Sequence, residues 1–213
     1  MKLRQICKIE IKNEHVVKGV QLEGVKKIST ITEAIDKATG SGAEEIFLID
    51  NTRSLFGLGP NYKMLLEAAR TSVLPITFGG GIKSLDEAMK SYSIGASRVY
   101  INSALANNHQ LARQIAFRCG RQSLSGGIEY SSDTFLANEC FAEAGREPLG
   151  TSVTERANRE ANHVGEFILT SIARDGTMKG PDLDIIDSIH KTNIPLVICG
   201  GIDIKRDINK LKE

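Results

Sequence analysis

The chain has 213 residues and a formal net charge of +1. Of these residues, 41% are hydrophobic and 25% are charged. These proportions are typical of a globular chain and exclude a disordered one, and the near-zero charge gives no reason to expect nucleic acid or a membrane as partner. The cysteines lack metal-binding spacing, and the amino terminus lacks a signal-peptide pattern. We therefore expect one domain over residues 1–213, a cytoplasmic location, and neither a metal nor another cofactor.

Seven short apolar runs predict buried parallel strands. In chain order they are residues 6–11, 46–50, 76–78, 98–102, a weaker run ending at 129, 167–170 and 196–199. Between them lie stretches of helical periodicity, among them residues 62–70, 84–92, 106–118, 154–161 and 185–190. This alternation predicts one parallel barrel, and residues 134–148, which interrupt it, predict a short hairpin over the barrel mouth.

The sequence contains an internal repeat. Residues 42–50 resemble 164–171, and residues 75–80 resemble 195–201, both about 120 residues apart. Such a repeat predicts an α/β fold, a (β/α)8 TIM barrel made of two duplicated half-barrels. Only residues 202–213 follow the last repeated turn, so we expect a C-terminally truncated barrel in which the eighth strand–helix unit is absent. An opening there would expose strand edges and lower stability.

Two carboxylates end strands that lie opposite each other in such a barrel. Glu10 ends the first predicted strand and Glu129 the fifth. Barrel chemistry takes place at the carboxyl ends of the strands, and a facing pair of carboxylates can serve as general acid and general base. The alternative is that each is a solvated carboxylate at a strand end.

Glycine, amide and hydroxyl groups follow four of the other predicted strands. Backbone N–H groups in glycine turns can approach an anion closely, although a single Gly-Gly turn is more often only a tight turn. Two such sets lie half a barrel apart, which favours a ligand with a phosphate at each end. The residues concerned are Gly79–Gly81 and Asn102-Ser103 in one set, and Asp175-Gly176-Thr177 and Gly200-Gly201 in the other.

The sequence resembles the HisF family, the cyclase subunits of imidazole glycerol phosphate synthase. The motifs that carry this resemblance span the chain: residues 16–20, 79–84, 101–104, 145–148, 170–171 and 174–177. Several are shared with the sister isomerase HisA, whereas residues 16–20 and 47–50 favour the cyclase. The resemblance implies a subunit that takes ammonia from a HisH-like glutaminase and uses it to cleave and cyclise a bisphosphorylated ribulosyl substrate.

The resemblance also implies roles for individual residues. Glu10 and Glu129 stand where the family has two catalytic aspartates. The substrate and phosphate residues would be Lys18, on a mobile first loop, with Asp50, Gly80, Gly81, Asn102, Ser103, Asp175, Gly176, Thr177, Gly200 and Gly201. At the amino-terminal starts of the strands, Arg4, Glu45, Arg98 and Glu166 match a family ring of alternating charges that gates ammonia entry, although a single charge at a strand start is usually only solvated.

Departures from the family pattern gather at the mouth. Both catalytic aspartates are glutamates here, residues 26–31 and 51–54 differ from the usual loops, and the chain has no Trp. An added methylene displaces a carboxylate by about 1 Å, which can cost on the order of a hundredfold in rate. Two hypotheses follow, with an inactive fragment as a third: an active cyclase subunit, or a paralogue without cyclase activity that conducts ammonia to a sugar amidotransferase of surface-polysaccharide synthesis.

Overall fold

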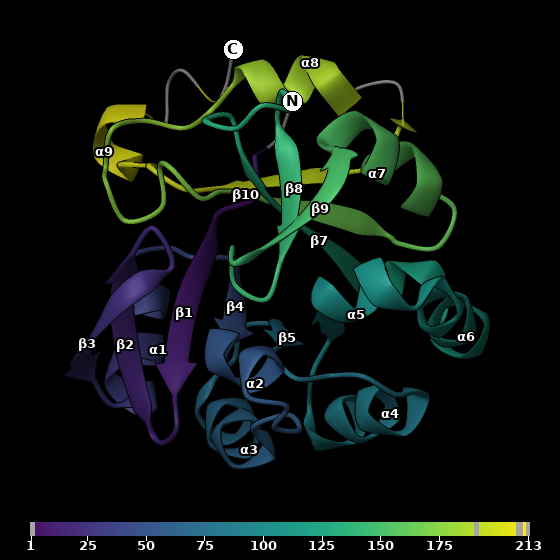
Figure 1. The fold of residues 1–213 in the computed structure, drawn as a ribbon. Helices are drawn as coiled ribbons and strands as arrows, with labels where there is room; N and C mark the ends of the chain where they lie inside the picture. Colours follow the sequence, from purple (N-terminus) through teal and green to yellow (C-terminus); the bar gives the residue numbers. More distant parts are fainter. Residues whose placement is uncertain (1–2, 190–191, 208–210, 212–213) are drawn as a thin grey trace.

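The computed structural model describes residues 3–189, 192–207 and 211. Seven parallel strands in this part form one curled sheet (Figure 1), in the order β11-β10-β7-β6-β5-β4-β1. They are β1 (Ile6–Lys12), β4 (Glu45–Ile49), β5 (Ile76–Gly79), β6 (Arg98–Ile101), β7 (Leu124–Ser131), β10 (Glu166–Ser171) and β11 (Leu196–Cys199). The α/β fold of truncated TIM-barrel type expected from the sequence is confirmed, and the seven strands match the seven apolar runs.

Helices lie between the strands. They are α1 (Ile31–Gly40), α2 (Asn51–Leu55), α3 (Tyr62–Thr71), α4 (Leu85–Ile94), α5 (Ser103–Asn107), α6 (His109–Cys119), α7 (Val153–Glu160), α8 (Asp184–Ile189) and α9 (Ile204–Asp207), with a 3₁₀ turn, η1, at Arg121–Ser123. Capping boxes at Thr30, Ser84 and Ser152 fix the starts of α1, α4 and α7.

The single helix expected over 106–118 is divided at Asn108, whose side chain caps α6. The helix expected over 185–190 ends at Ile189, and His190 lies outside the described residues. Every described helix is too short or too polar to cross a membrane.

The two faces of the sheet carry separate hydrophobic clusters, because successive strand side chains alternate between the faces. The large cluster joins strand residues such as Leu48 and Phe78 to the helices that cover the sheet. The small cluster, formed by Phe47, Ile49, Tyr100 and Ile168, lies on the opposite face and fills the lumen of the curled sheet. The lumen is thus packed where these side chains meet, with polar groups at its two ends.

Two antiparallel hairpins extend the carboxyl ends of the strands. β8 (Glu139–Ala142) and β9 (Glu147–Ser152) extend β7, as the sequence predicts for residues 134–148. β2 (His15–Val20) and β3 (Glu23–Ser29) extend β1, where the sequence predicts a loop and not a hairpin. The turn of this second hairpin places Gln21 and Leu22 in the left-handed region, without the Asn-Gly pair that usually marks such a turn.

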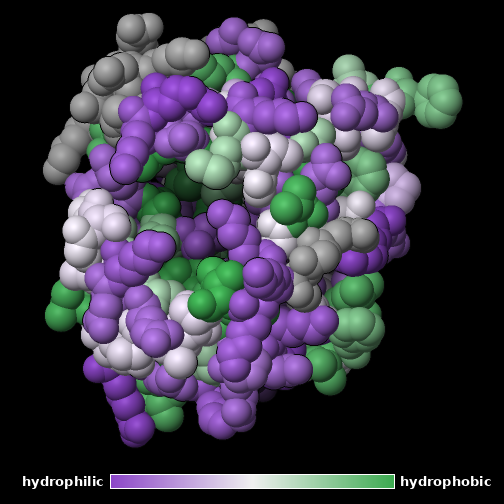
Figure 2. All heavy atoms as spheres, turned by 90° about the vertical axis from the view of Figure 1, so that its left-hand side faces the viewer, coloured by the Kyte–Doolittle hydropathy of each residue, from purple (hydrophilic) through white to green (hydrophobic). Residues whose placement is uncertain are grey.

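The curled sheet is open between β1 and β11 in the described part of the chain. All four residues of β11 are half-buried, whereas every residue of β4, β5 and β10 is buried. Several contacts join the β1 side to the loop after β10: Lys8 Nζ lies 3.4 Å from Asp175 Oδ1, Gln21 N donates to Asp175 O at 2.9 Å, and Gln21 Nε2 donates to Ala173 O at 3.3 Å. Figure 2 views the side that carries β2, β3 and α9, and shows a hollow with hydrophobic atoms in its depth and a mostly hydrophilic rim.

Candidate functional site

Four charged side chains at the amino ends of the strands form a closed ring. Arg4 lies 3.1 Å from Glu45 and 2.5 Å from Glu166, and Arg98 lies 3.0 Å from Glu45 and 3.8 Å from Glu166. The two carboxylates are only 2% and 3% exposed. A carboxylate buried to this extent is costly unless it is paired and hydrogen-bonded, and the ring supplies both kinds of partner.

Hydroxyl groups complete the ring. Thr77 Oγ1 donates to Glu45 at 2.5 Å, and Ser125 Oγ donates to Glu166 at 2.7 Å. The structure therefore brings together all four residues that the sequence places at the amino-terminal end, and it adds two that the sequence analysis did not single out. Alternating charge in a closed ring can admit a small neutral molecule while hindering the passage of an ion.

Glu129 lies at the carboxyl end of β7 and is 5% exposed. Its Oε2 accepts a hydrogen bond from Gly145 N at 3.0 Å. Burial raises the pKa of Glu129 to about 7, against the opposing effects of Lys8, the Gly145 amide, Arg156 and the Asn102 side chain. A carboxyl group that titrates near neutral pH can both donate and accept a proton, as general acid–base chemistry requires.

Glu10, at the opposite side of the mouth, is held in an ion pair. Lys8 Nζ lies 2.8 Å from Glu10 Oε1 and 3.4 Å from Asp175 Oδ1, and Asn51 Nδ2 donates to Glu10 at 3.2 Å. Burial acts to lower the pKa of Lys8, but Glu10 and Asp175 outweigh it and raise that pKa above its ordinary value. The two glutamates thus differ: Glu10 has a fixed cation beside it, whereas Glu129 is set mainly by burial.

Sequence reasoning missed Lys8. The signal was present, because Lys8 is the one charged residue in the run Ile6–Ile9 and stands two residues before Glu10, on the same face of the strand. A lysine in a strand is usually solvated, and only the curled sheet shows that this one lies between two carboxylates.

Two cavities open at the carboxyl ends of the strands. The smaller, about 40 Å³, is lined by Gly80, Gly81, Asn102 and Ser103 of the first predicted phosphate set, but not by Gly79, and also by Asp50 and Glu129. The larger, about 200 Å³, is lined by Glu10, Lys12, Arg146 and residues of β2 and α2. The two share Asn51 and Ala144, so Glu10 and Glu129 open into neighbouring cavities and not into the same one.

The turn between β8 and β9 covers the smaller cavity. Glu143 N donates to Ser103 Oγ at 3.0 Å, next to the bond from Gly145 N to Glu129. Glu143, Ala144 and Gly145 all have left-handed backbone, and Ala144 lines the cavity. A cavity of about 40 Å³ holds little more than a water molecule, so a phosphate would have to displace this turn.

Asp50 is a structural cap in this arrangement. It is completely buried, and its carboxylate accepts from Thr52 N at 3.1 Å, Thr52 Oγ1 at 2.6 Å, Arg53 Nε at 3.2 Å and Asn61 Nδ2 at 3.2 Å. These bonds start α2 and hold the loop against which Gly80 packs.

The second predicted set of residues lines neither cavity. Asp175 binds Lys8, Thr177 Oγ1 donates to Arg174 O at 2.7 Å, and Lys18 is exposed on β2. Three glycines there are closely packed, since a Cβ would meet Gly19 O at 2.6 Å from Gly176, Ser171 O at 2.8 Å from Gly200 and Gly180 O at 2.2 Å from Gly201. Within the described residues, no cluster of three or more His, Cys, Asp or Glu side chains can hold a metal ion.

Comparison with known proteins gives consistent results. The family model described as "Histidine biosynthesis protein" matches residues 5–213. Imidazole glycerol phosphate synthase subunit HisF of Legionella pneumophila is 34% identical over 209 residues, which cover 97% of this chain and 99% of that protein. A HisF2-named subunit of Pseudomonas aeruginosa is 33% identical over 205 residues, covering 95% and 82%, and HisF of Dictyoglomus thermophilum is 31% identical over 198 residues, covering 92% and 79%.

Proposed function

We propose that this chain, which belongs to the histidine biosynthesis protein family and is HisF-like, is the ammonia-using subunit of a glutaminase-coupled complex. The observation that carries the proposal is the closed ring of Arg4, Glu45, Arg98 and Glu166 at one end of a lumen whose other end holds Glu129. A HisH-like glutaminase would bind at the ring, and a phosphorylated substrate at the mouth. Such a complex would work in the cytoplasm.

The charges along the lumen favour ammonia over ammonium. The two arginines of the ring are paired with the two glutamates, so NH4⁺ would have to displace an arginine to reach a carboxylate, whereas neutral NH3 disturbs none of these ion pairs. Lys8 lies between carboxylates near the mouth, which leaves the acid–base work to Glu129. Glu129 would take the proton released when ammonia attacks the substrate, or donate one to the leaving group.

Binding of a HisH-like glutaminase is the first prediction of this proposal. With the cognate HisH-like glutaminase, we expect a complex of the two chains and a glutamine hydrolysis rate that rises as the present chain is added, until one partner is saturated. Absence of both a complex and a rate increase would refute the glutaminase-coupled function.

A second candidate function is that of an ammonia-conducting paralogue without cyclase activity. Two observations favour it: Glu10 is bound by Lys8, and the cavity beside Glu129 is too small for a sugar phosphate unless the β8–β9 turn moves. The acceptor would then be a substrate on another protein, such as a sugar amidotransferase.

Cyclase activity separates the two candidates. With ammonium salts and the bisphosphorylated ribulosyl substrate, the paralogue gives little or no imidazole glycerol phosphate, and the double variant Glu10→Asp/Glu129→Asp recovers part of the activity. Rapid turnover by the unaltered protein would instead assign it to the histidine-type reaction.

A further inference from the structure

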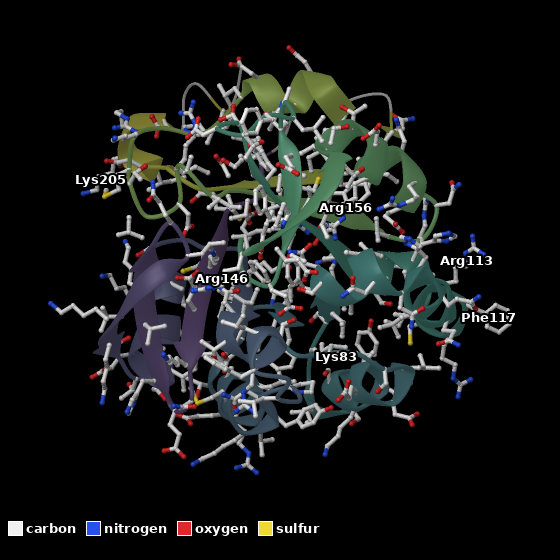
Figure 3. All side chains as sticks on the ribbon, in the orientation of Figure 1. Lys83, Arg113, Phe117, Arg146, Arg156 and Lys205 are labelled. Carbon is white, nitrogen blue, oxygen red and sulfur yellow. The ribbon has the colours of Figure 1, made fainter. Side chains whose placement is uncertain are left out.

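Arg156, on α7, is a buried cation that the sequence analysis did not identify. It is 0% exposed, and Figure 3 shows it inside the molecule, whereas Arg113 and Phe117 of α6 point outward. Within the described residues, Arg156 has no carboxylate at ion-pair distance, and its Nε and Nη1 have no hydrogen-bond partner. Burial lowers its pKa, as expected for a guanidinium removed from water. A cation held at this cost requires an explanation.

The third nitrogen of this guanidinium binds Asn102. Nη2 donates to the main-chain oxygen of Asn102 at 2.9 Å and to its Oδ1 at 2.8 Å. A guanidinium has only donors, so it fixes which end of the asparagine amide faces it. Oδ1 points toward Arg156, and the NH2 group points the other way.

The NH2 group of Asn102 is thereby directed toward β8, where Nδ2 donates to Phe141 O at 3.3 Å. Phe141 lies opposite Glu129 in the β7–β8 register, and Asn102 and Glu129 line the same cavity. From this position the Asn102 side chain lowers the pKa of Glu129. If the amide were turned over, its oxygen would face the carboxylate and repel it. The orientation set by Arg156 thus determines whether Asn102 stabilises the ionised form of Glu129.

We propose that Arg156 is a positioning residue that orients the amide of Asn102 and thereby sets how readily Glu129 releases its proton. The inference deepens the proposed function, because Glu129 is the acid–base group there, but it concerns a property of the free protein. The positioning role of Arg156 can therefore be refuted while the coupling to a glutaminase holds. The coupling can likewise be refuted while the role of Arg156 holds.

Other charged and polar groups around Glu129 also affect its pKa, so the test must separate their effects from that of Arg156. Lys8 acts on Glu129 from β1, the Gly145 amide from the β8–β9 turn and Arg156 from α7, all favouring the ionised form. Tyr100 of β6 stays neutral, because burial raises its pKa well above the ordinary value. Burial of Glu129 itself favours the protonated form. Burial outweighs the other influences and raises the pKa of Glu129 to about 7, so the loss of a group that favours the ionised form should raise it further.

The test is the titration of the Glu129 carboxyl carbon, followed by NMR in ¹³C-glutamate-labelled protein and assigned with Glu129→Gln. In Arg156→Met, which keeps an unbranched apolar side chain but removes the charge and the donors, we expect the pKa of Glu129 to rise by about one unit. Arg156→Lys, which restores the charge and N–H donors, should recover most of that rise. Arg159→Met is the matched control, since Arg159 is on the same helix but half-exposed and bound to Glu160.

A double-variant cycle tests the route through Asn102. In an Asn102→Ala background, Arg156→Met should shift the pKa of Glu129 by less than half of its effect in the unaltered protein. Should Arg156→Met fail to fold, Asn102→Ala alone decides, because it leaves Arg156 in place and must still raise the pKa. An unchanged Glu129 titration in folded Arg156→Met, or in Asn102→Ala, would overturn the proposal.

Discussion

Glu129 and Lys8 show how one barrel gives two buried ionisable side chains opposite behaviour. Lys8 has two carboxylates within reach, so it stays charged. Glu129 has amide donors but no cation in contact, so burial dominates and its pKa rises to about 7. Environment, and not residue type, decides which of them can transfer a proton at neutral pH.

Glu129 makes stability depend on pH in a defined direction. Its folded-state pKa is raised from 4.5 to about 7, so the folded state binds the proton more tightly than the unfolded state between these values. The contribution of Glu129 to the free energy of unfolding is therefore fully present below pH 4.5. It is lost as the pH rises to about 7, where the loss reaches about 3 kcal/mol. Glu129→Gln should lack this fall, which urea unfolding at a series of pH values would detect. Parallel pH profiles for both proteins would contradict the assignment.

The contribution of the Lys8 ion pairs to stability can be measured by replacing Lys8. Lys8→Met leaves Glu10 and Asp175 without their shared cation, so we expect a loss of about 3 kcal/mol in the free energy of unfolding at pH 7. Adding Glu10→Gln to this variant should restore part of the loss, since one unpaired carboxylate is removed. Denaturant unfolding measures both, and a loss below about 0.5 kcal/mol for Lys8→Met would show that the pair is solvated.

Sequence reasoning found some of these residues and not others for physical reasons. Glu10 and Glu129 are identifiable because they end strands whose geometry in a barrel is known. Arg156 is not, because the segment Thr154–Glu160 is polar at every position but Ala157, and no periodicity distinguishes a buried arginine from a solvated one. Burial of such a side chain is determined by the hairpin and strands that pack over it.

Close packing of main chain against main chain determines the conformation of the turns at the carboxyl ends of the strands. Gly80 has φ +103°, and a Cβ there would lie 2.3 Å from Asp50 O. The turn after β5 is thereby locked to the loop before α2. The strands themselves were predictable because each is an apolar run, whereas the β2–β3 hairpin was not, since its lysines and glutamate resemble a solvated loop.

Gly80→Ala tests this packing, and Gly42→Ala is its control. Gly42 has φ +82°, but a Cβ added there would meet no atom within 4 Å, so its substitution should cost about 1 kcal/mol for backbone conformation alone. Gly80→Ala adds a collision with main chain and should cost roughly 3 kcal/mol more. It should also abolish binding of inorganic phosphate, observed by ³¹P NMR, if the smaller cavity is the phosphate site. Equal costs for the two variants would contradict the packing argument.

At the scale of the whole molecule, two features define the architecture: the closed ring at the amino ends of the strands and the opening between β1 and β11. Side chains across the opening, chiefly Lys8 with Asp175 and Arg4 with Glu166, connect its two sides. The half-buried residues of β11 remain in partial contact with solvent. The repeat in the sequence predicted this opening, but not the contacts that cross it.

The opening predicts a limited stability for residues 1–213. Extending residues 1–213 with an added strand–helix unit would pair the free edge of β11 with the part of β1 that β2 leaves unpaired, and bury apolar residues of both strands. We expect a higher Tm for the extended chain and less association at high concentration. A cooperative, monomeric transition at the same Tm for both chains would show that the opening costs nothing.

The most direct measurement of the central claim is the response of the glutaminase to the ring. Glutamine hydrolysis and binding affinity are compared for the unaltered chain, Arg98→Ala and the control Arg113→Ala, whose arginine is exposed on α6 and contacts His163. We predict a change of about tenfold or more in hydrolysis rate or affinity for Arg98→Ala and none for Arg113→Ala. Equal rates and affinities for all three proteins, and likewise for substitutions of Arg4, Glu45 and Glu166, would contradict this prediction.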